Sequence, residues 1–189
     1  MKEIKVALLG FGGIAKSHKK GYDVLAAEGA KVRLVAICDI NPEQFKKLEA
    51  ATNLGSEGKL TLDDIHTDTD CEEMIAKEEI DMVDICLPTY LHKDYTVRML
   101  KAGKHVLCEK PMALSSKDCE EMIRVAKECD RKLMIGQCLR FEPAYVYLKE
   151  CVDSGRFGKL KYLHMDRLSP LPKWSFEHWF RDTAKSGGC

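Results

Sequence analysis

Short apolar runs alternate with helix-like segments along most of this sequence, and this alternation limits the folds that the chain can adopt. Strands that alternate with helices form a parallel sheet covered on both faces. The predicted strands are residues 5–9, 32–38, 65–67, 82–87, 105–108 and 133–135. Periodicity and capping signals predict helices at residues 13–28, 71–77, 91–102, after Asn41-Pro42, after the Ser115 capping box, and around 145–152. We therefore predict a doubly wound α/β fold.

The composition argues against two kinds of partner. The 189 residues carry 30 Lys and Arg against 30 Asp and Glu, so the formal net charge is zero. This balance disfavours a nucleic-acid-binding protein with a dominant basic surface. No apolar run approaches the ~18 residues that a membrane helix needs. The first six residues lead into a strand without the apolar segment of a secretory signal. We expect no nucleic acid and no membrane as partners.

The nine cysteines form no C-x-x-C pair, and their number is odd. Cys38, Cys86 and Cys108 lie within apolar strand-like runs, where a free cysteine behaves as a small hydrophobic residue. The alternative is a metal cluster, but the spacing does not match that of zinc sites. We therefore expect reduced core thiols, no metal, and a reducing, cytoplasmic location.

The turn between the first strand and the first helix is rich in glycine. It is Gly10-Phe11-Gly12-Gly13-Ile14-Ala15 and fits G-x-G-x-x-A. In this context Gly10 permits the tight turn, Gly12 lets the backbone approach a pyrophosphate, and Ala15 allows close helix packing. The N–H groups at the helix N-terminus favour phosphate binding. We expect residues 10–14 to contact a dinucleotide; the alternative is an ordinary glycine-rich turn.

Asp39 ends the second predicted strand, 24 positions after Ala15. A carboxylate there can accept hydrogen bonds from the ribose of an adenosine and would repel a 2′-phosphate. Ile40 and Asn41 follow, so no adjacent Arg or Lys is ready to hold that phosphate. The alternative is an exposed strand-end Asp that caps the next helix. Together, the turn and Asp39 favour NAD over NADP.

Two further segments leave predicted strands at the carboxyl edge, where ligands bind in open α/β sheets. The first is Leu87-Pro88-Thr89 with His92, in which Thr89 either contacts the cofactor or caps the next helix. The second is Glu109-Lys110-Pro111, in which Lys110 is well placed to point into the same crevice. The alternative for this second segment is a surface turn.

These motifs resemble the Gfo/Idh/MocA oxidoreductases, a family that includes glucose-fructose oxidoreductase and inositol dehydrogenase. The resemblance rests on the glycine turn, Asp39, Leu87-Pro88 with His92, and above all residues 102–111, AGKHVLCEKP. It continues through residues 136–143 and 155–158, Trp179 and residues 186–188, and so covers essentially the whole chain. The block at 102–111 is highly specific for the family, whereas the glycine turn is not.

The resemblance implies a Rossmann domain that binds NAD(P), here residues 1–155, followed by the start of an α+β domain at residues 156–189. Residues 159–168 are predicted to form its first strand. Family members are longer, so we expect a truncated chain, with the catalytic His of the family located beyond Cys189. The full-length form is expected to be a homo-oligomer.

The activity that the resemblance implies is hydride transfer between a nicotinamide cofactor and an alcohol carbon of a sugar, inositol or related polyol. Lys110 would contact the cofactor and the substrate, and would stabilise negative charge on the reacting oxygen. The other matched positions are Glu109, Gln137 and Arg140 near the cofactor and, more weakly, Trp179 and Arg181 at the substrate edge. Two alternatives stay open: a non-catalytic dinucleotide-binding sensor of the same fold, and another type of Rossmann reductase.

Overall fold

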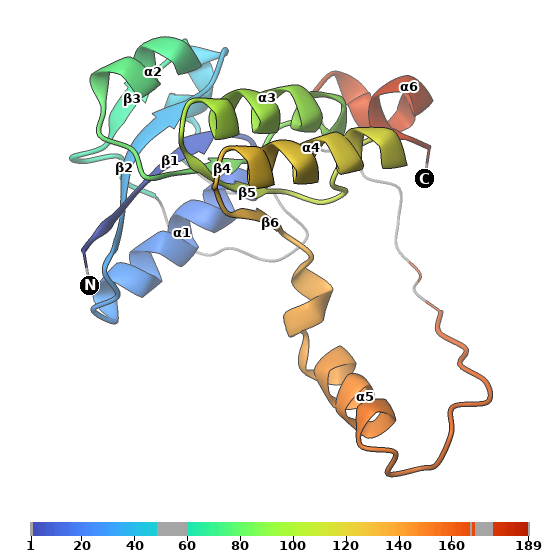
Figure 1. Cartoon of the computed structure of the whole chain (residues 1–189). Helices are drawn as coiled ribbons and strands as arrows, with labels where there is room; N and C mark the ends of the chain where they lie inside the picture. The colour runs from blue at the N-terminus through green and yellow to red at the C-terminus, as the bar shows by residue number, and fades with distance from the viewer. Residues whose placement is uncertain (1, 49–59, 167, 169–175, 189) are drawn as a thin grey trace.

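The computed structural model describes residues 2–48, 60–166, 168 and 176–188. Its six strands are β1 (Ile4–Leu9), β2 (Val32–Cys38), β3 (His66–Asp68), β4 (Met82–Ile85), β5 (His105–Cys108) and β6 (Leu133–Ile135). All neighbouring strands pair in parallel, in the order β3-β2-β1-β4-β5-β6 (Figure 1). This is the strand order of a Rossmann fold, and it confirms the predicted fold class.

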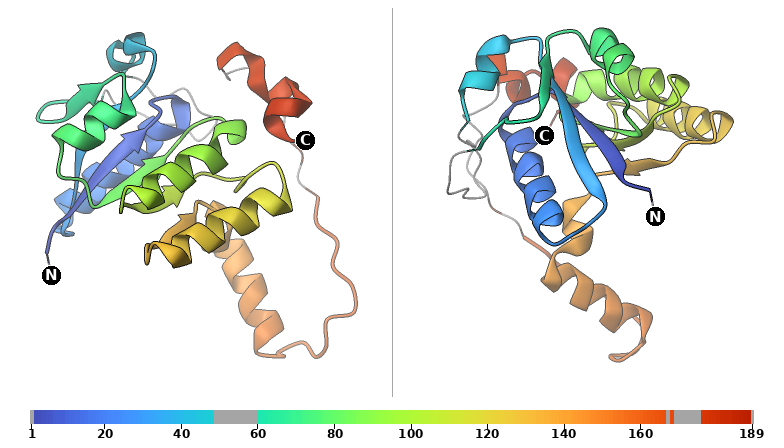
Figure 2. Two further views of the ribbon diagram at one scale, coloured as in Figure 1. Left: turned by 45° about the horizontal axis from the view of Figure 1, so that its top comes forward. Right: turned by 90° about the vertical axis from the view of Figure 1, so that its left-hand side faces the viewer.

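Helices cover both faces of the sheet. The α-helices are α1 (Gly13–Ala27), α2 (Cys71–Lys77), α3 (Thr89–Lys101), α4 (Ser116–Glu128), α5 (Pro143–Asp153) and α6 (Thr183–Ser186). Three 3-10 helices are η1 (Pro42–Lys46), η2 (Cys138–Phe141) and η3 (Phe176–Arg181). Helix α1 lies on one side of the sheet, and α3 and α4 lie on the other (Figure 2). Helix α5 extends away from the sheet (Figure 1).

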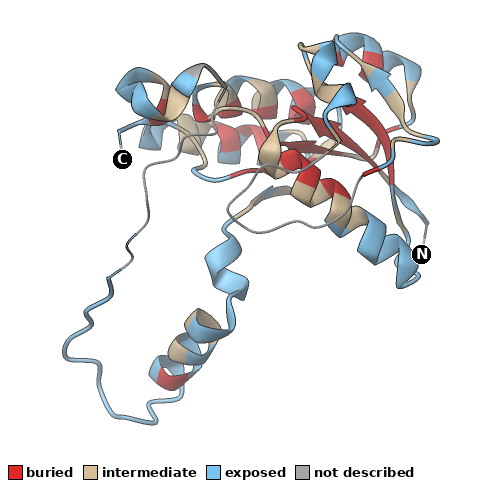
Figure 3. Cartoon of the chain, turned by 180° about the vertical axis from the view of Figure 1, so that it is seen from behind, coloured by how far each residue is buried: buried red, intermediate tan, exposed pale blue. Residues whose placement is uncertain are grey.

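The central strands are buried on both faces, as is typical of an all-parallel sheet covered by helices. On β1, Val6 and Leu8 pack in the apolar cluster shared with α1, whereas Ala7 and Leu9 pack in the cluster shared with α3 and α4. Buried residues accordingly run along the central strands, while α5 is mostly exposed (Figure 3). Cys38, on β2, is also buried, so the expected core position of this thiol is confirmed.

Local sequence signals set most helix boundaries. The side chain of Asp70 accepts hydrogen bonds from the backbone at the start of α2, and Ser115 does the same for α4. Gly29 and Gly103 follow α1 and α3 with φ of +79° and +78°, a conformation that glycine adopts readily. Among the described helices, none is long and apolar enough to cross a membrane.

Two predicted elements differ from the structure. The helix expected after Asn41-Pro42 is only the short 3-10 helix η1, although Asn41 does cap it by accepting the N–H of Glu43 at 3.1 Å. Residues 159–166 form no strand, so the strand predicted at 159–168 is wrong in the described part of the chain. Alternating apolar residues make a strand only where a second strand supplies hydrogen bonds, and residues 159–166 have none beside them.

Candidate active site

The strands end together, which brings distant parts of the sequence to one edge of the sheet. In the parallel register Leu9 pairs with Cys38 and Ile85, Ile85 pairs with Cys108, and Cys108 pairs with Ile135. The predicted site segments follow directly: the glycine turn after β1, the aspartate after β2 and the lysine loop after β5. This carboxyl edge is where open α/β sheets bind ligands.

The glycine turn is closely packed at its first residue and open at its second. Gly10 has a φ of +89°, and a Cβ there would lie 2.8 Å from the carbonyl oxygen of Cys86. Its N–H donates to the carbonyl of Cys38 at 2.8 Å. A Cβ on Gly12 would meet nothing within 4 Å. Gly10 therefore fixes the turn, and Gly12 leaves space above the backbone.

The N-terminus of α1 fits a bound pyrophosphate. Gly12 is the N-cap residue and forms no side-chain cap, and the first turn carries no acidic side chain. The N–H groups of this turn and the positive end of the helix dipole are therefore not neutralised by the protein itself. Gly13 and Ile14 begin the helix and are partly exposed. The space above Gly12 gives a phosphate group access to them.

Asp39 is tied to the glycine turn. Its Oδ2 accepts the backbone N–H of Phe11 at 2.7 Å, and its Oδ1 accepts the N–H of Asn41 at 2.8 Å. Asn41, and not Asp39, caps the following helix, so the capping alternative for Asp39 is wrong. Each carboxylate oxygen can accept a second hydrogen bond, which leaves capacity for the hydroxyls of a ribose.

Phe11, which is predicted to contact a cofactor, packs its side chain in the core. Its side chain is fully buried, and its ring lies 6.2 Å from that of Phe45. Its N–H is already donated to Asp39. A bulky apolar residue inside a glycine turn is explained here by core packing, and Phe11 acts on the site by holding Asp39.

One lysine lies closer to Asp39 in space than its place in the sequence suggested. Lys16 on α1 is 4% exposed, with its ammonium 5.5 Å from the centre of the Phe11 ring. Burial and the charge of Lys47 lower the pKa of Lys16, while the charge of Asp39 opposes this. Lys16 therefore interacts electrostatically with Asp39, although it does not follow Asp39 directly in the sequence.

The segment after β4 packs inward. Pro88 is the N-cap of α3 without a side-chain cap, and Thr89 is 2% exposed within the first turn, so Thr89 is not the capping residue. The ring of buried His92 lies 2.7 Å from the carbonyl oxygen of Pro111 through Nδ1 and 2.8 Å from that of Leu87 through Nε2. His92 thus links the loops after β4 and β5, while Leu87 and Pro88 stay partly exposed.

Lys110 leaves the carboxyl end of β5 with an exposed side chain. Its backbone N–H donates to Oε2 of Glu109 at 3.1 Å, and Glu109 itself is buried. Gln137 and Arg140 are exposed and follow β6, with Gln137 as the N-cap residue of η2. The structure thus places Lys110, Gln137 and Arg140 after neighbouring strands, whereas Glu109 points into the protein.

Trp179 and Arg181 lie in η3, near the N-terminal end of α3. The ring of Trp179 stacks on that of Phe180 at 4.0 Å, and Arg181 is exposed. The ammonium of Lys185 in the adjacent α6 lies 5.9 Å from the ring centre of Tyr90, which is in the first turn of α3. Because α3 begins at the carboxyl edge of the sheet, this contact places α6 at the edge where the other predicted residues lie.

A buried polar cluster that the sequence analysis missed lies beneath the site. The two ring nitrogens of His18 contact two carboxylates: Nδ1 lies 2.8 Å from Oδ2 of Asp84, and Nε2 lies 3.1 Å from Oε1 of Glu109. The hydroxyl of Tyr22 donates to Asp84 at 2.9 Å, and Sγ of Cys86 lies 3.5 Å from Nδ1 of His18. Asp84 is fully buried. An Asp within an apolar strand was the available signal, because a buried charge needs a partner.

The cluster shifts the protonation of its members. Burial disfavours the charged form of His18, but hydrogen bonds to Asp84, Cys86 and Glu109 outweigh it and raise the pKa of His18 far above its ordinary value. Burial would raise the pKa of Glu109, but the hydrogen bond and charge of His18 hold it below the ordinary value. Burial and the charge of Asp84 raise the pKa of the Cys86 thiol to about 12. These shifts favour an imidazolium at His18, a carboxylate at Glu109 and a neutral thiol at Cys86.

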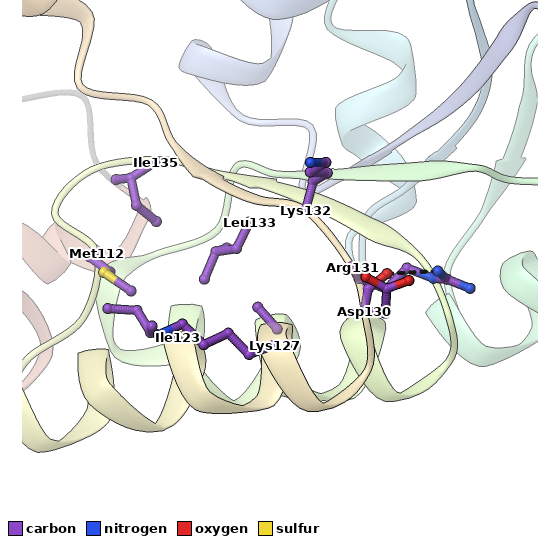
Figure 4. A pocket seen from close by; sticks show the side chains of 9 residues that line it. Met112, Ile123, Lys127, Asp130, Arg131, Lys132, Leu133 and Ile135 are labelled. Atoms are coloured by element: carbon purple, nitrogen blue, oxygen red, sulfur yellow. Dashed lines mark hydrogen bonds between the residues drawn. The ribbon is translucent and has the colours of Figure 1, made fainter.

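A groove of about 480 Å³ lies elsewhere, between α4 and the outer strand β6 (Figure 4). Met112, Ile123, Leu133 and Ile135 form its apolar wall, and Lys127 extends along it. None of its lining residues is a predicted site residue. The site described above is therefore an open edge of the sheet and is separate from this groove.

Comparison with known proteins agrees with this geometry. Residues 4–137 match the family described as "Oxidoreductase family, NAD-binding Rossmann fold". The chain is 32% identical over 167 residues to inositol 2-dehydrogenase of Rhizobium meliloti, covering 88% of this chain and 46% of that protein. It is 31% identical over 188 residues to 2,7-anhydro-N-acetylneuraminate hydratase of Mediterraneibacter gnavus, covering all of this chain and 46% of that protein. The chain thus spans about half the length of these relatives.

Solved structures show the same fold. The WlbA dehydrogenase from Bordetella pertussis, in complex with NADH and UDP-GlcNAcA, matches with a TM-score of 0.68 and 29% identity, over 83% of this chain and 44% of that chain. The myo-inositol 2-dehydrogenase from Lactobacillus plantarum matches with a TM-score of 0.68 and 28% identity, over 84% and 43%. The sequence match, the strand order and the glycine turn agree: this chain belongs to the Gfo/Idh/MocA family of oxidoreductases with an NAD-binding Rossmann fold.

Proposed function

We propose that this chain is the cofactor-binding part of an oxidoreductase that uses NAD in preference to NADP and acts on a CH–OH group of a sugar, an inositol or a related polyol. The observation that carries the proposal is the joined pair of the glycine turn and Asp39. Gly12 leaves room for a pyrophosphate at the N-terminus of α1, and Asp39 offers a carboxylate for an adenosine ribose.

The names of the relatives support the substrate class. One relative is named for inositol oxidation and another for hydration of an anhydro sugar acid. A solved neighbour is described in complex with NADH and a nucleotide sugar acid. Polyhydroxylated rings are common to these names, whereas the net reaction differs between them. We therefore propose a class of substrates, the polyhydroxylated rings, and not the reaction of any single relative.

Lys110 and four other predicted residues have roles in this proposal. A bound nicotinamide cofactor supplies hydride transfer. Lys110, exposed after β5, would donate a hydrogen bond to the reacting oxygen and stabilise negative charge there. Gln137 and Arg140, exposed after β6, would line the nicotinamide side of the crevice. Trp179 and Arg181 would lie at the substrate edge.

We further propose that residues 156–189 belong to a second domain that completes the substrate site and mediates a homo-oligomer. Support comes from the exposure of large apolar side chains in this segment, which is unusual for a finished surface. Tyr162 is 78% exposed, and Leu160, Leu163 and Met165 are each 51% exposed. Burial against further protein would remove this apolar surface from water.

The test is reduction of NAD⁺, followed by NADH absorbance, with myo-inositol and a panel of sugars, for the protein that includes the proposed second domain and for its Lys110→Ala variant. The 189-residue chain alone is expected to bind the cofactor with little or no turnover. From the longer protein we expect turnover with at least one polyol. Removing a hydrogen-bond donor from a developing oxyanion should lower kcat about 10²–10³-fold while NADH affinity stays within a factor of about two. Turnover that persists undiminished in Lys110→Ala would contradict the role of Lys110. NADH binding without any turnover would favour a non-catalytic dinucleotide-binding protein.

A further inference from the structure

We propose that His18 is a positioning residue for Lys110: its ring bridges Asp84 and Glu109, and Glu109 in turn holds the peptide that carries Lys110. The catalytic role of Lys110 rests on the function proposed above, whereas the contacts of His18 and Glu109 do not depend on it. His18 lies in the second turn of α1, one helical turn beyond the glycine turn. The bridge therefore joins the cofactor-binding helix to the loop after β5.

The contacts of the ring define its state. Nδ1 lies 2.8 Å from Asp84 and Nε2 lies 3.1 Å from Glu109, and ionised carboxylates can only accept hydrogen bonds. Both ring nitrogens must therefore donate, which requires the imidazolium. Asp84 lies on β4, and Glu109 follows β5 directly. A positive charge on the ring between them would offset the cost of burying two negative carboxylates.

Glu109 divides its two oxygens between two tasks. Its Oε1 faces His18, and its Oε2 accepts the backbone N–H of Lys110 at 3.1 Å. A Cβ on Gly136, which follows β6, would lie only 3.0 Å from Oε1, so the backbone at Gly136 restricts the carboxylate from one direction. His18 restricts it from another direction. The Glu109 side chain therefore has a defined orientation, and the Lys110 peptide has a fixed acceptor.

A cation site is the competing interpretation. Ligand atoms of His18, Asp84 and Cys86 lie within 4.8 Å of one another. A bound metal would need the unprotonated nitrogen of His18 and the thiolate of Cys86. Nδ1 of His18 and Oδ2 of Asp84 are 2.8 Å apart, which is a hydrogen-bond distance, and Sγ of Cys86 lies 3.7 Å from Oδ1 of Asp84 as a donor. The proposed bridge therefore uses these contacts as hydrogen bonds.

The first test is NMR of the 189-residue chain with ¹⁵N-labelled histidine, which requires neither cofactor nor substrate. We expect both ring nitrogens of His18 to carry protons at about pH 8, where an unperturbed histidine is neutral. A neutral ring, or a ring whose nitrogen signal changes when a chelator removes zinc, would overturn the bridge.

The second test measures hydrogen exchange of the Lys110 amide in His18→Gln. A glutamine side chain places an oxygen against one of the two carboxylates and cannot donate to both as the imidazolium does. We expect exchange at Lys110 to become about tenfold faster, the equivalent of one lost hydrogen bond. His66→Gln is the matched control, because His66 also lies between two carboxylates, Asp68 and Glu78, but at the outer strand β3. Unchanged exchange at Lys110 in folded His18→Gln would overturn the proposal.

The double variant His18→Gln with Glu109→Gln provides a rescue. The amide introduced at position 109 can donate to the amide introduced at position 18 and still accept the Lys110 N–H, so a neutral chain of hydrogen bonds replaces the ionic one. We expect slower exchange at Lys110 than in His18→Gln alone, a non-additive result that general loosening does not produce. Strictly additive effects would contradict the proposal. Because NADH binding is titrated separately, failure of the proposed function leaves these readouts intact.

Discussion

Oδ2 of Asp39 accepts the backbone N–H of Phe11 at 2.7 Å, so the end of β2 is tied directly to the glycine turn after β1. The two residues are 28 positions apart in the sequence. This contact places a carboxylate beside the opening above Gly12 and holds it without using all of its acceptor capacity. The proposed phosphate and ribose contacts thus belong to two segments that this hydrogen bond joins.

The first prediction concerns the charge of Asp39. Asp39→Asn should weaken NADH binding about tenfold, because the amide accepts hydrogen bonds from a ribose less well than the carboxylate. It should weaken NADPH binding less, or improve it, because the repulsion of a 2′-phosphate is gone and Lys16 interacts electrostatically with this position. Calorimetric titration with both nucleotides measures this. Asp23→Asn, an exposed Asp of α1 paired with Lys19, is the control.

The second prediction separates folding from binding within the glycine turn. Gly10→Ala should lower the free energy of unfolding by about 1–3 kcal/mol, since an alanine is strained at positive φ and its Cβ would collide with the Cys86 carbonyl. Gly12→Ala should change it by no more than about 1 kcal/mol but weaken NADH binding about tenfold, because its Cβ occupies the open space. Denaturant unfolding measures the change in stability, and NADH titration measures the change in binding. Equal effects of both variants on stability would contradict this description.

The third prediction concerns pH. The folded-state pKa of His18 is raised, so its stabilisation is complete below the unfolded value of about 6.5 and is lost progressively as the pH rises. Between about pH 6.5 and 8.5, the unfolding free energy of the unmodified chain should fall by up to about 1.4 kcal/mol per pH unit relative to His18→Gln. Urea titrations across this window measure the difference. Parallel pH profiles for the two proteins would contradict the charged bridge.

The fourth prediction concerns His92. Its buried ring joins the carbonyls of Leu87 and Pro111, so His92→Ala should destabilise the chain by about 2–4 kcal/mol through a cavity and unpaired carbonyl groups. His164→Ala, at an exposed histidine, should change stability by less than about 0.5 kcal/mol. Thermal unfolding of both variants provides the comparison. If His92→Ala were as stable as His164→Ala, the two loops would not depend on this ring.

Much of the fold follows from local sequence, because strand and helix signals agree with the tertiary arrangement. The Asp70 and Ser115 caps are examples in which one side chain fixes a boundary. The strand predicted at residues 159–168 failed because a strand depends on a partner, and alternation alone cannot supply one.

The site was only partly predictable. Gly10, Asp39 and Lys110 follow strands, so their placement at one edge could be inferred from the parallel topology. The bridge of His18 could not be inferred in this way, because its partners lie far away in the sequence. Asp84 is 66 positions from His18, and Glu109 is 91 positions from it. The core packing of the Phe11 side chain was also not predicted, because its position in the motif suggested a ligand contact.

The central claim is that the glycine turn and Asp39 form a dinucleotide site that prefers NAD. The most direct test is calorimetric titration of the 189-residue chain with NADH and, separately, with NADPH, alongside Gly12→Ala. The account predicts saturable binding of one NADH per chain, weaker binding of NADPH, and loss of NADH affinity in the folded Gly12→Ala variant. A folded chain that binds neither nucleotide, or that binds NADH equally well after the Gly12→Ala substitution, would contradict it.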